Sequence, residues 1–301
     1  MANMLANDFF QTSYFYRNSQ NLTWKAKQLP AVKQLLNLAY SREVSSHKST
    51  LPTLSSSHSN MLADLNTKGV HQTNLSQLAI PDTDEMVRKA WEILNDRTQF
   101  YSDGSRNRIS TAALNQHPEI FFWGANEALL DLAENYIQLP VYYLGAELKR
   151  EVCDDSLEGV RCWHIDKEDR RMMKVIIYLN DVDEQGGPFE CMSKPLSQTA
   201  SKAMNYSSGL ISDEQMEQYI PSDYWQACTG PKHSAFMVDT CSIFHRARPP
   251  IGQDRYSITF HYISQSPLMT YEKVYFGDME ALNHRLSPRQ KQCLRSRSSS
   301  K

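Results

Sequence analysis

The pattern of apolar residues changes near residue 140, and this change limits the folds that the chain can adopt. Before it, apolar residues recur at the spacing of an amphipathic helix in three stretches, 29–42, 81–97 and 126–139. After it, β-branched and aromatic residues gather in runs of strand length that are bounded by turns. Helices followed by strands predict an α+β chain whose second half is a β-sandwich or barrel.

The strand half contains four runs that are typical of β-strands, at 141–152, 173–182, 234–245 and 255–264. A Gly-Gly-Pro turn within "DEQGGPFE" (183–190) separates two of them. One helix interrupts the strands near 212–220, where Ser212 and Gln215 have the spacing of a capping box. We therefore expect strands with a short helical insert.

The chain is expected to fold as one domain over 1–301. Its first part, 1–139, is mainly helical and includes a Ser-rich surface loop at 41–60. The β core occupies 140–270, and a basic, flexible tail follows at 286–301. The first 80 residues carry no functional motif that we can place.

Charge and composition exclude several classes of function. The chain has 32 Lys and Arg residues against 34 Asp and Glu residues, and the charges are interspersed. This balance does not favour nucleic acid or an anionic membrane as a partner. No apolar stretch is long enough to cross a bilayer, and six scattered cysteines without a C-x-x-C pair favour reduced thiols in a cytoplasm. No pattern indicates an oligomeric state.

The triplet His164-Ile165-Asp166 contains two side chains that could bind a metal ion. Side chains two apart on a strand point to the same face, so this pair can bind one ion from one side. A short motif of this kind also recurs by chance on ordinary strands. A redox iron needs a third ligand and open positions, which the two-histidine, one-carboxylate triad of non-haem iron(II) oxygenases provides.

Three histidines downstream are candidates for the third ligand: His233, His245 and His261. His245 ends an apolar run, and Arg255 opens a strand ten residues later with Ser257 on the same face. A guanidinium beside a hydroxyl suits the distal carboxylate of a dicarboxylate such as 2-oxoglutarate. Arg246, at a comparable distance from His233, falls in a turn, and no arginine lies at such a distance beyond His261. We therefore favour His245, although each histidine taken alone fits an ordinary hydrogen-bonded residue.

The stretch 162–264 resembles the phytanoyl-CoA dioxygenase family, a branch of the iron(II)/2-oxoglutarate oxygenases. The matching pieces are "WHIDKEDRRMMKVIIYLNDVDEQGGPFE" and "FMVDTCSIFHRARPPIGQDRYSITFHY". The family's usual Gly-Ser-His is replaced by "CMSKP" (191–195), which alters a loop. The resemblance implies a double-stranded β-helix, a cupin-like jelly roll, with N-terminal helices packed on it. It also implies the site residues: His164, Asp166 and His245 as iron ligands, and Arg255 with Ser257 for the 2-oxoglutarate C5 carboxylate.

The activity that the resemblance implies is hydroxylation of a C–H bond of a small molecule, with release of succinate and CO2. The cofactors are Fe(II) and 2-oxoglutarate, with O2 as cosubstrate, and a secondary metabolite is the expected kind of substrate. In halogenating relatives a small residue replaces the acidic ligand, so Asp166 disfavours halogenation. Desaturation, epimerisation or cyclisation by the same machinery remains an alternative, as does a non-catalytic jelly-roll binding protein.

Five further residues are weaker candidates. Lys174 and Tyr178, on the strand after the motif, are placed to reach 2-oxoglutarate. Trp163 is a candidate for the pocket wall, although a tryptophan on a strand is more often part of the core. Lys167 and Asp169 follow the ligands directly and are candidates for substrate contact, although such a charged string is usually a solvated loop.

Overall fold

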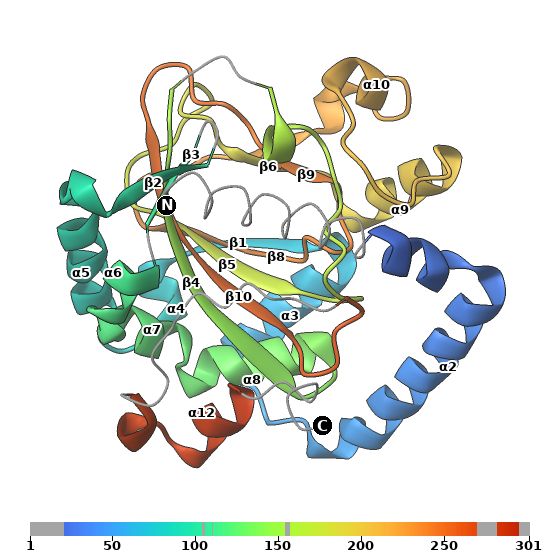
Figure 1. The fold of residues 1–301 in the computed structure, drawn as a ribbon, viewed down its shortest axis with the longest axis horizontal. Helices are drawn as coiled ribbons and strands as arrows, with labels where there is room; N and C mark the ends of the chain where they lie inside the picture. The colour runs from blue at the N-terminus through green and yellow to red at the C-terminus, as the bar shows by residue number, and fades with distance from the viewer. Residues whose placement is uncertain (1–20, 104–105, 110, 154–156, 270–281, 295–301) are drawn as a thin grey trace, which may run out of the picture. The chain divides into compact units, whose positions relative to one another are not determined.

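The computed structural model describes residues 21–103, 106–109, 111–153, 157–269 and 282–294. It divides into two compact units, 1–50 and 51–301, where the sequence suggests one domain. In the described part of the first unit, 21–28 is helical and is followed by α2 (Pro30–His47) and η1 (Lys48–Thr50). The second unit holds the described strands (Figure 1).

The Ser-rich stretch 41–60, expected as a loop, is largely helical, so this prediction is wrong. α2 runs through its first part, and the hydroxyls of Ser45 and Ser46 donate to carbonyls of the preceding turn. In the second unit Ser55 caps α3 (Ser56–Lys68) by accepting from the N–H of His58 at 3.2 Å. Serines that satisfy the backbone locally do not interrupt a helix, which the composition alone does not reveal.

The other described helices of the second unit lie before, within and after the strands. The expected helices 81–97 and 126–139 are present with slightly shorter bounds, and the capping box of Ser212 and Gln215 is confirmed. The helices are α4 (Leu75–Leu78), α5 (Thr83–Asn95), α6 (Thr111–Asn115), α7 (Pro118–Gly124), α8 (Glu127–Ile137), α9 (Lys194–Ala203), α10 (Asp213–Glu217) and α12 (Pro288–Cys293), with 3-10 turns at Arg97–Gln99, Gly159–Arg161, Ser222–Tyr224 and Asn283–Arg285.

The strands form two antiparallel sheets, which confirms the expected α+β class and jelly-roll core. The large sheet has the order β1-β8-β5-β10-β4-β3-β2, and the small one has the order β7-β6-β9. Their bounds are β1 (Val70–Asn74), β2 (Phe100–Asp103), β3 (Arg106–Ile109), β4 (Val141–Glu151), β5 (Met173–Tyr178), β6 (Phe189–Cys191), β7 (Gln226–Cys228), β8 (Ser234–Val238), β9 (His245–Ala247) and β10 (Arg255–Ser264).

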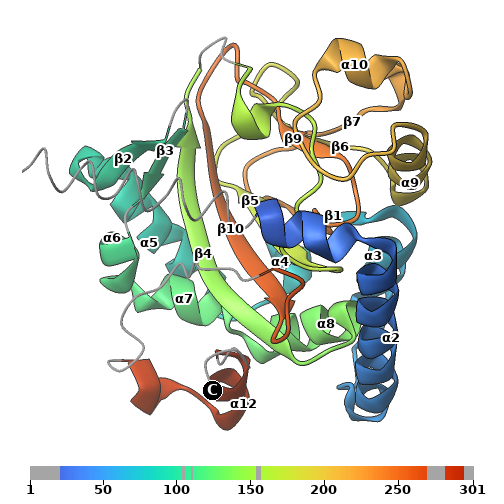
Figure 2. The same ribbon diagram turned by 45° about the vertical axis from the view of Figure 1, so that its right-hand side comes forward.

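The large sheet has an outer face covered by helices and an inner face turned to the small sheet (Figure 2). On the outer face Phe260 of β10 packs on Trp123 of α7, with ring centroids 4.7 Å apart. On the inner face Ile176 and Tyr178 of β5 belong to one buried cluster with Phe189 of β6. Because side chains alternate along a strand, the inner face of β10 carries a polar row, which consists of Arg255, Ser257, Thr259 and His261.

The turn at Gly187 needs a glycine, which explains the Gly-Gly-Pro signal. Its φ is +66°, and a Cβ there would lie 2.4 Å from the backbone nitrogen of Pro250. Only glycine tolerates both the left-handed backbone and this close approach. The turn joins β5 to β6 and so connects the two sheets.

The expected strand 234–245 is two strands, because the chain turns sharply at Asp239. The fully buried Asp239 carboxylate accepts hydrogen bonds from the hydroxyls of Tyr136 and Ser242 and from the N–H of Met172 at 3.2 Å. The carboxylate holds the turn that carries the chain from β8 in the large sheet to His245 in the small one.

The hydroxyl of Tyr136 is expected to stabilise this turn measurably. We predict that Tyr136→Phe lowers the free energy of unfolding by about 2 kcal/mol, because the buried carboxylate loses a donor. The matched control is Tyr262→Phe, which removes a hydroxyl that donates to the neutral carbonyl of Gly124 at 2.7 Å and should cost about 1 kcal/mol. Urea titration of both variants measures the difference, and equal losses would contradict the assigned role of Asp239.

The tail expected to be flexible over 286–301 begins with an ordered helix. Ser287 and Gln290 form a second capping box at the start of α12, and Cys293 is buried. Residues 295–301 lie outside the described part of the chain. Within that part, no helix is long and apolar enough to cross a membrane.

Candidate metal centre

Two strand segments far apart in sequence meet at His164 and His245. Each backbone N–H donates to the carbonyl of the other residue, at 3.1 and 3.0 Å, so the pair forms an isolated antiparallel bridge. Residues directly opposite each other point to the same face. The two imidazoles therefore lie side by side, with ring centroids 4.3 Å apart.

Asp166 completes the group. Its Oδ1 lies 3.6 Å from Nε2 of His164, and its Oδ2 lies 3.8 Å from Nε2 of His245. These separations are too long for hydrogen bonds. One donor atom from each of the three residues lies within 4.8 Å of the others, a spacing at which the group can hold one metal ion. The N–H of Asp166 donates to the carbonyl of Thr240 at 2.9 Å, which ties the ligand loop to the turn before His245.

Backbone carbonyls fix the tautomer of both histidines. Nδ1 of His164 lies 2.8 Å from the carbonyl of Cys162, and Nδ1 of His245 lies 3.1 Å from that of Ile243. A carbonyl only accepts, so each Nδ1 must be the donor and each Nε2 has a free lone pair in the neutral ring. Burial, with the neighbouring His164, lowers the pKa of His245 to about 3, so this ring is neutral at ordinary pH.

Lys174 holds the carboxylate of Asp166 in its charged form. Its Nζ donates to Oδ2 of Asp166 at 2.6 Å. Burial alone would raise the pKa of Asp166, but Lys174 and the two imidazoles outweigh it and hold this pKa well below its usual range. The carboxylate of Asp166 and the imidazole of His245 are therefore both in the forms that bind a metal ion.

The other two histidines that were considered as third ligand lie elsewhere. His233 has φ +75°, donates its N–H to the carbonyl of Tyr178, and lines a separate pocket of about 460 Å³ at α4 and α5. His261 is buried on the inner face, with Nε2 3.8 Å from a carboxylate oxygen of Glu147. Of the three candidates, the structure brings only His245 together with His164 and Asp166.

Arg255 lies at the start of the polar row on β10 and is 4% exposed. Its Nη2 is 3.8 Å from Oε1 of Glu151, a carboxylate that Arg161 approaches to 3.9 Å. Among the described residues, Nη1 of Arg255 has no hydrogen-bond partner although it is buried. Two buried guanidinium groups thus approach one carboxylate, and Nη1 of Arg255 still lacks an acceptor among the described residues. This arrangement fits a bound anion.

Tyr178 and Phe189 connect the arginine to the candidate metal centre. Tyr178 lies opposite Ser257 in the sheet, and its hydroxyl donates to the carbonyl of Cys228 and accepts from the N–H of Phe189. The ring of Phe189 packs on that of His245 with centroids 5.6 Å apart. The Tyr178 hydroxyl is thus bonded within the core, and Ser257 is buried beside it.

The weaker candidates next to the ligands face different surroundings. Trp163 is fully buried in a cluster on the opposite side of the strand from His164. The carboxylate of Asp169 accepts from three backbone N–H groups, those of Arg170, Ser264 and Leu268, and therefore closes a loop. Lys167 is half-buried, and burial lowers its pKa. Of these, Trp163 and Asp169 are directed into the fold.

Sequence reasoning missed Glu168, which lies beside the centre. Burial and the charge of Asp166 raise the pKa of its carboxyl to about 7. Among the described residues, Oε2 of Glu168 has no hydrogen-bond partner. Thr259 Oγ1, on the polar row of β10, is likewise buried without one. The period of two on β10 was visible in the sequence and would have placed Thr259 on the face of Arg255; no sequence signal distinguished Glu168 from its charged neighbours.

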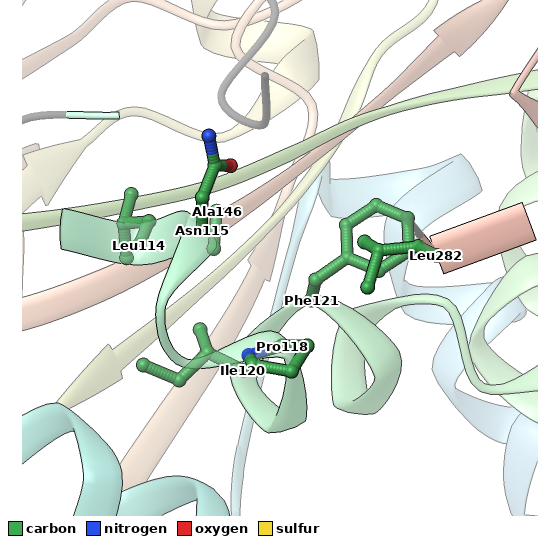
Figure 3. Close-up of a pocket in the computed structure, with 7 residues that line it drawn as sticks. All are labelled: Leu114, Asn115, Pro118, Ile120, Phe121, Ala146 and Leu282. Atoms are coloured by element: carbon green, nitrogen blue, oxygen red, sulfur yellow. The ribbon is translucent and has the colours of Figure 1, made fainter. Parts of the chain in front are cut away.

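A small apolar cavity of about 10 Å³ lies elsewhere, against α7 (Figure 3). It has no ionisable side chain in its lining and therefore fits a packing void better than a site. Its lining residues are Leu114, Asn115, Pro118, Ile120, Phe121, Ala146 and Leu282.

No family model matches the sequence, and no curated protein matches it. Solved structures do match. The non-heme alpha ketoglutarate dependent carbocyclase SnoK from nogalamycin biosynthesis is 14% identical, with 79% of this chain and 95% of that chain covered and a TM-score of 0.49. EctD from S. alaskensis is 15% identical, with 73% and 80% covered and a TM-score of 0.49. The epimerase SnoN is 11% identical, with 70% and 86% covered and a TM-score of 0.45. Similarity of this degree assigns no activity to this chain.

Proposed function

We propose that this chain is an iron(II)- and 2-oxoglutarate-dependent oxygenase that hydroxylates a C–H bond of a polar small molecule. The observation that carries the proposal is the convergence of His164, Asp166 and His245, with both Nδ1 atoms anchored on carbonyls and both Nε2 atoms directed at the carboxylate. Two imidazoles and one carboxylate are the donor set of non-haem iron(II) oxygenases.

These residues fit the metal chemically. His164 and His245 would bind it through Nε2, and Asp166 would bind it through a carboxylate that Lys174 keeps ionised. When bound, iron(II) and 2-oxoglutarate supply oxidation of a substrate C–H bond by dioxygen, coupled to decarboxylation of 2-oxoglutarate to succinate and CO2. The protein supplies ligand geometry and a site from which most water is excluded.

Arg255 is the residue that we propose for the distal carboxylate of 2-oxoglutarate. Its buried Nη1 lacks an acceptor among the described residues, and a carboxylate bound there would supply one. Ser257, two residues on and on the same face, would add a hydroxyl donor. Tyr178 and Lys174 would act indirectly, because each already bonds within the fold.

The polar inner face favours a polar substrate over a hydrocarbon chain. Thr259 Oγ1 is buried without a partner among the described residues, and the carboxylate of Glu147 lies buried 3.4 Å from Nζ of Lys149. Glu168 adds a carboxyl near Asp166 whose Oε2 is buried. An apolar substrate would leave Oγ1 of Thr259 and Oε2 of Glu168 without hydrogen bonds, which costs about 1 to 3 kcal/mol for each group.

The test is anaerobic addition of iron(II) and then 2-oxoglutarate to the purified chain. We expect a weak visible absorption band that needs both additions, and slow succinate formation once air is admitted. Zinc(II) with 2-oxoglutarate is the control and should give no band. A chain that binds zinc and iron equally but gives neither the band nor succinate would be a non-catalytic metal-binding protein, and the proposal would be wrong.

A further inference from the structure

The small sheet carries a second set of contacts on the face turned away from the imidazoles. Trp163 and Arg246 each adjoin a candidate ligand, His164 and His245, and therefore point to the opposite face. The two side chains meet there, with the guanidinium carbon of Arg246 4.6 Å from the centroid of the Trp163 ring. A cation on an indole face is attracted to it, more strongly when both are buried.

The same guanidinium also reaches the next strand. Glu190 of β6 lies opposite Arg246 of β9, and Nε of Arg246 donates to Oε2 of Glu190 at 2.6 Å. Both side chains are 5% exposed. A row of three contacting side chains, Trp163, Arg246 and Glu190, thus backs the strands that place His164 and His245 on the inner face.

A loop beyond the small sheet closes over this row. Asp213, the first residue of α10, accepts from Nε1 of Trp163 at 3.0 Å and also from Nη1 of Arg246. The rings of Trp225 and Trp163 lie with their centroids 5.1 Å apart. The guanidinium carbon of Arg246 is 5.4 Å from the centroid of the Trp225 ring. Arg246 is therefore held by two carboxylates and two indoles.

We propose that Arg246 is a positioning residue of the candidate metal centre, which sets the register of the two histidine strands from their outer face. This inference rests on the proposed function. His164 and His245 face each other through an isolated bridge and not through a continuous strand ladder, so few backbone hydrogen bonds oppose a slip or a splay of one segment against the other. The contacts of Arg246 with Trp163 and Glu190 oppose such movement, because they connect the segment of Trp163 and His164 to β9 and β6.

The chemistry of the site requires arginine. A planar guanidinium stacks on an indole and donates to two carboxylates at once, whereas the compact ammonium of lysine does not. Loss of the outer contacts would let the imidazoles separate, so metal affinity would fall even though every ligand is still present. Groups that orient metal ligands typically change affinity about 10- to 100-fold when they are removed.

The experiment measures cobalt(II) binding to the metal-free chain by visible absorbance, with circular dichroism as a check on folding. The test variants are Arg246→Lys and the double variant Arg246→Met with Glu190→Gln, which leaves no unpaired buried carboxylate at position 190. The control is Arg289→Met, which removes an arginine that bonds Asp131 at 3.2 Å and links α12 to α8 away from the small sheet.

We expect the Kd for cobalt(II) to rise at least about 10-fold in the double variant, to rise less in Arg246→Lys, and to stay within about twofold in the control. If the double variant does not fold, the Kd of Arg246→Lys for cobalt(II) tests the inference, because this variant keeps a positive charge beside Glu190. Variants that melt earlier but bind cobalt(II) as the wild type does would show a purely structural role and overturn the inference. Failure of the wild type itself to bind cobalt(II) would overturn both this inference and the proposed function.

Discussion

Replacement of Asp166 by asparagine is expected to abolish 2-oxoglutarate turnover, with a loss of about 1000-fold or more, or about 4 kcal/mol of barrier. The change keeps the size of the side chain but removes the charge that faces both imidazoles at 3.6 and 3.8 Å. An amide oxygen is a much weaker ligand for a divalent transition metal than a carboxylate. Titration with iron(II) under anaerobic conditions and a succinate assay check the two parts of this expectation.

The same substitution also disturbs the fold, and a second variant separates the two effects. Lys174 donates to Asp166 at 2.6 Å, and loss of this charged hydrogen bond destabilises the chain by about 2 kcal/mol. The double variant Asp166→Asn with Lys174→Met removes both charges and should recover much of that free energy of unfolding without recovering metal binding. Recovery of metal binding in the double variant would show that Asp166 serves the fold and is not a ligand.

The site could be predicted from sequence to the extent that it depends on strand alternation and strand ends. His164 and Asp166 on one face, and His245 at the end of an apolar run, are local features that the structure places together. β10 was predicted with its observed bounds, which placed Arg255 at its start and Ser257 on the same face. These positions follow from the alternation of side chains along a strand, a two-residue pattern that can be recognised in the sequence.

What the sequence did not reveal depends on contacts between distant segments. Asp239 breaks the expected strand 234–245, because its buried carboxylate binds a hydroxyl from α8, 103 residues away. Glu168 could not be separated from the charged residues around it, since its role depends on burial beside Asp166. Arg246 contacts residues of four separate segments, and no periodic pattern in the sequence predicts these contacts. The residues are Trp163, Glu190, Asp213 and Trp225.

The second large effect is expected at Arg255. We predict that Arg255→Met weakens 2-oxoglutarate binding about 100-fold, or about 2.7 kcal/mol, because the distal carboxylate loses a buried, charged donor. Binding of the metal alone should stay within about twofold, since Arg255 is not among the three donors. Arg255→Lys should recover part of the affinity, because lysine keeps the charge but not the paired donors of a guanidinium. Titration of 2-oxoglutarate into the cobalt(II)-loaded chain gives these values.

A comparison of two 2-oxo acids makes this prediction specific. 2-Oxobutyrate lacks the distal carboxylate, so the wild type should bind it far more weakly than 2-oxoglutarate, and Arg255→Met should nearly erase that preference. Addition of Glu151→Gln removes the carboxylate that Arg255 approaches at 3.8 Å, so the net charge of these three side chains equals that of the wild type again, but the preference should not return. A preference that survives in both variants would mean that another group binds the distal carboxylate. A preference lost only in the single variant would mean that the Glu151 carboxylate repels the dicarboxylate once Arg255 is absent, and that Arg255 acts by offsetting this charge.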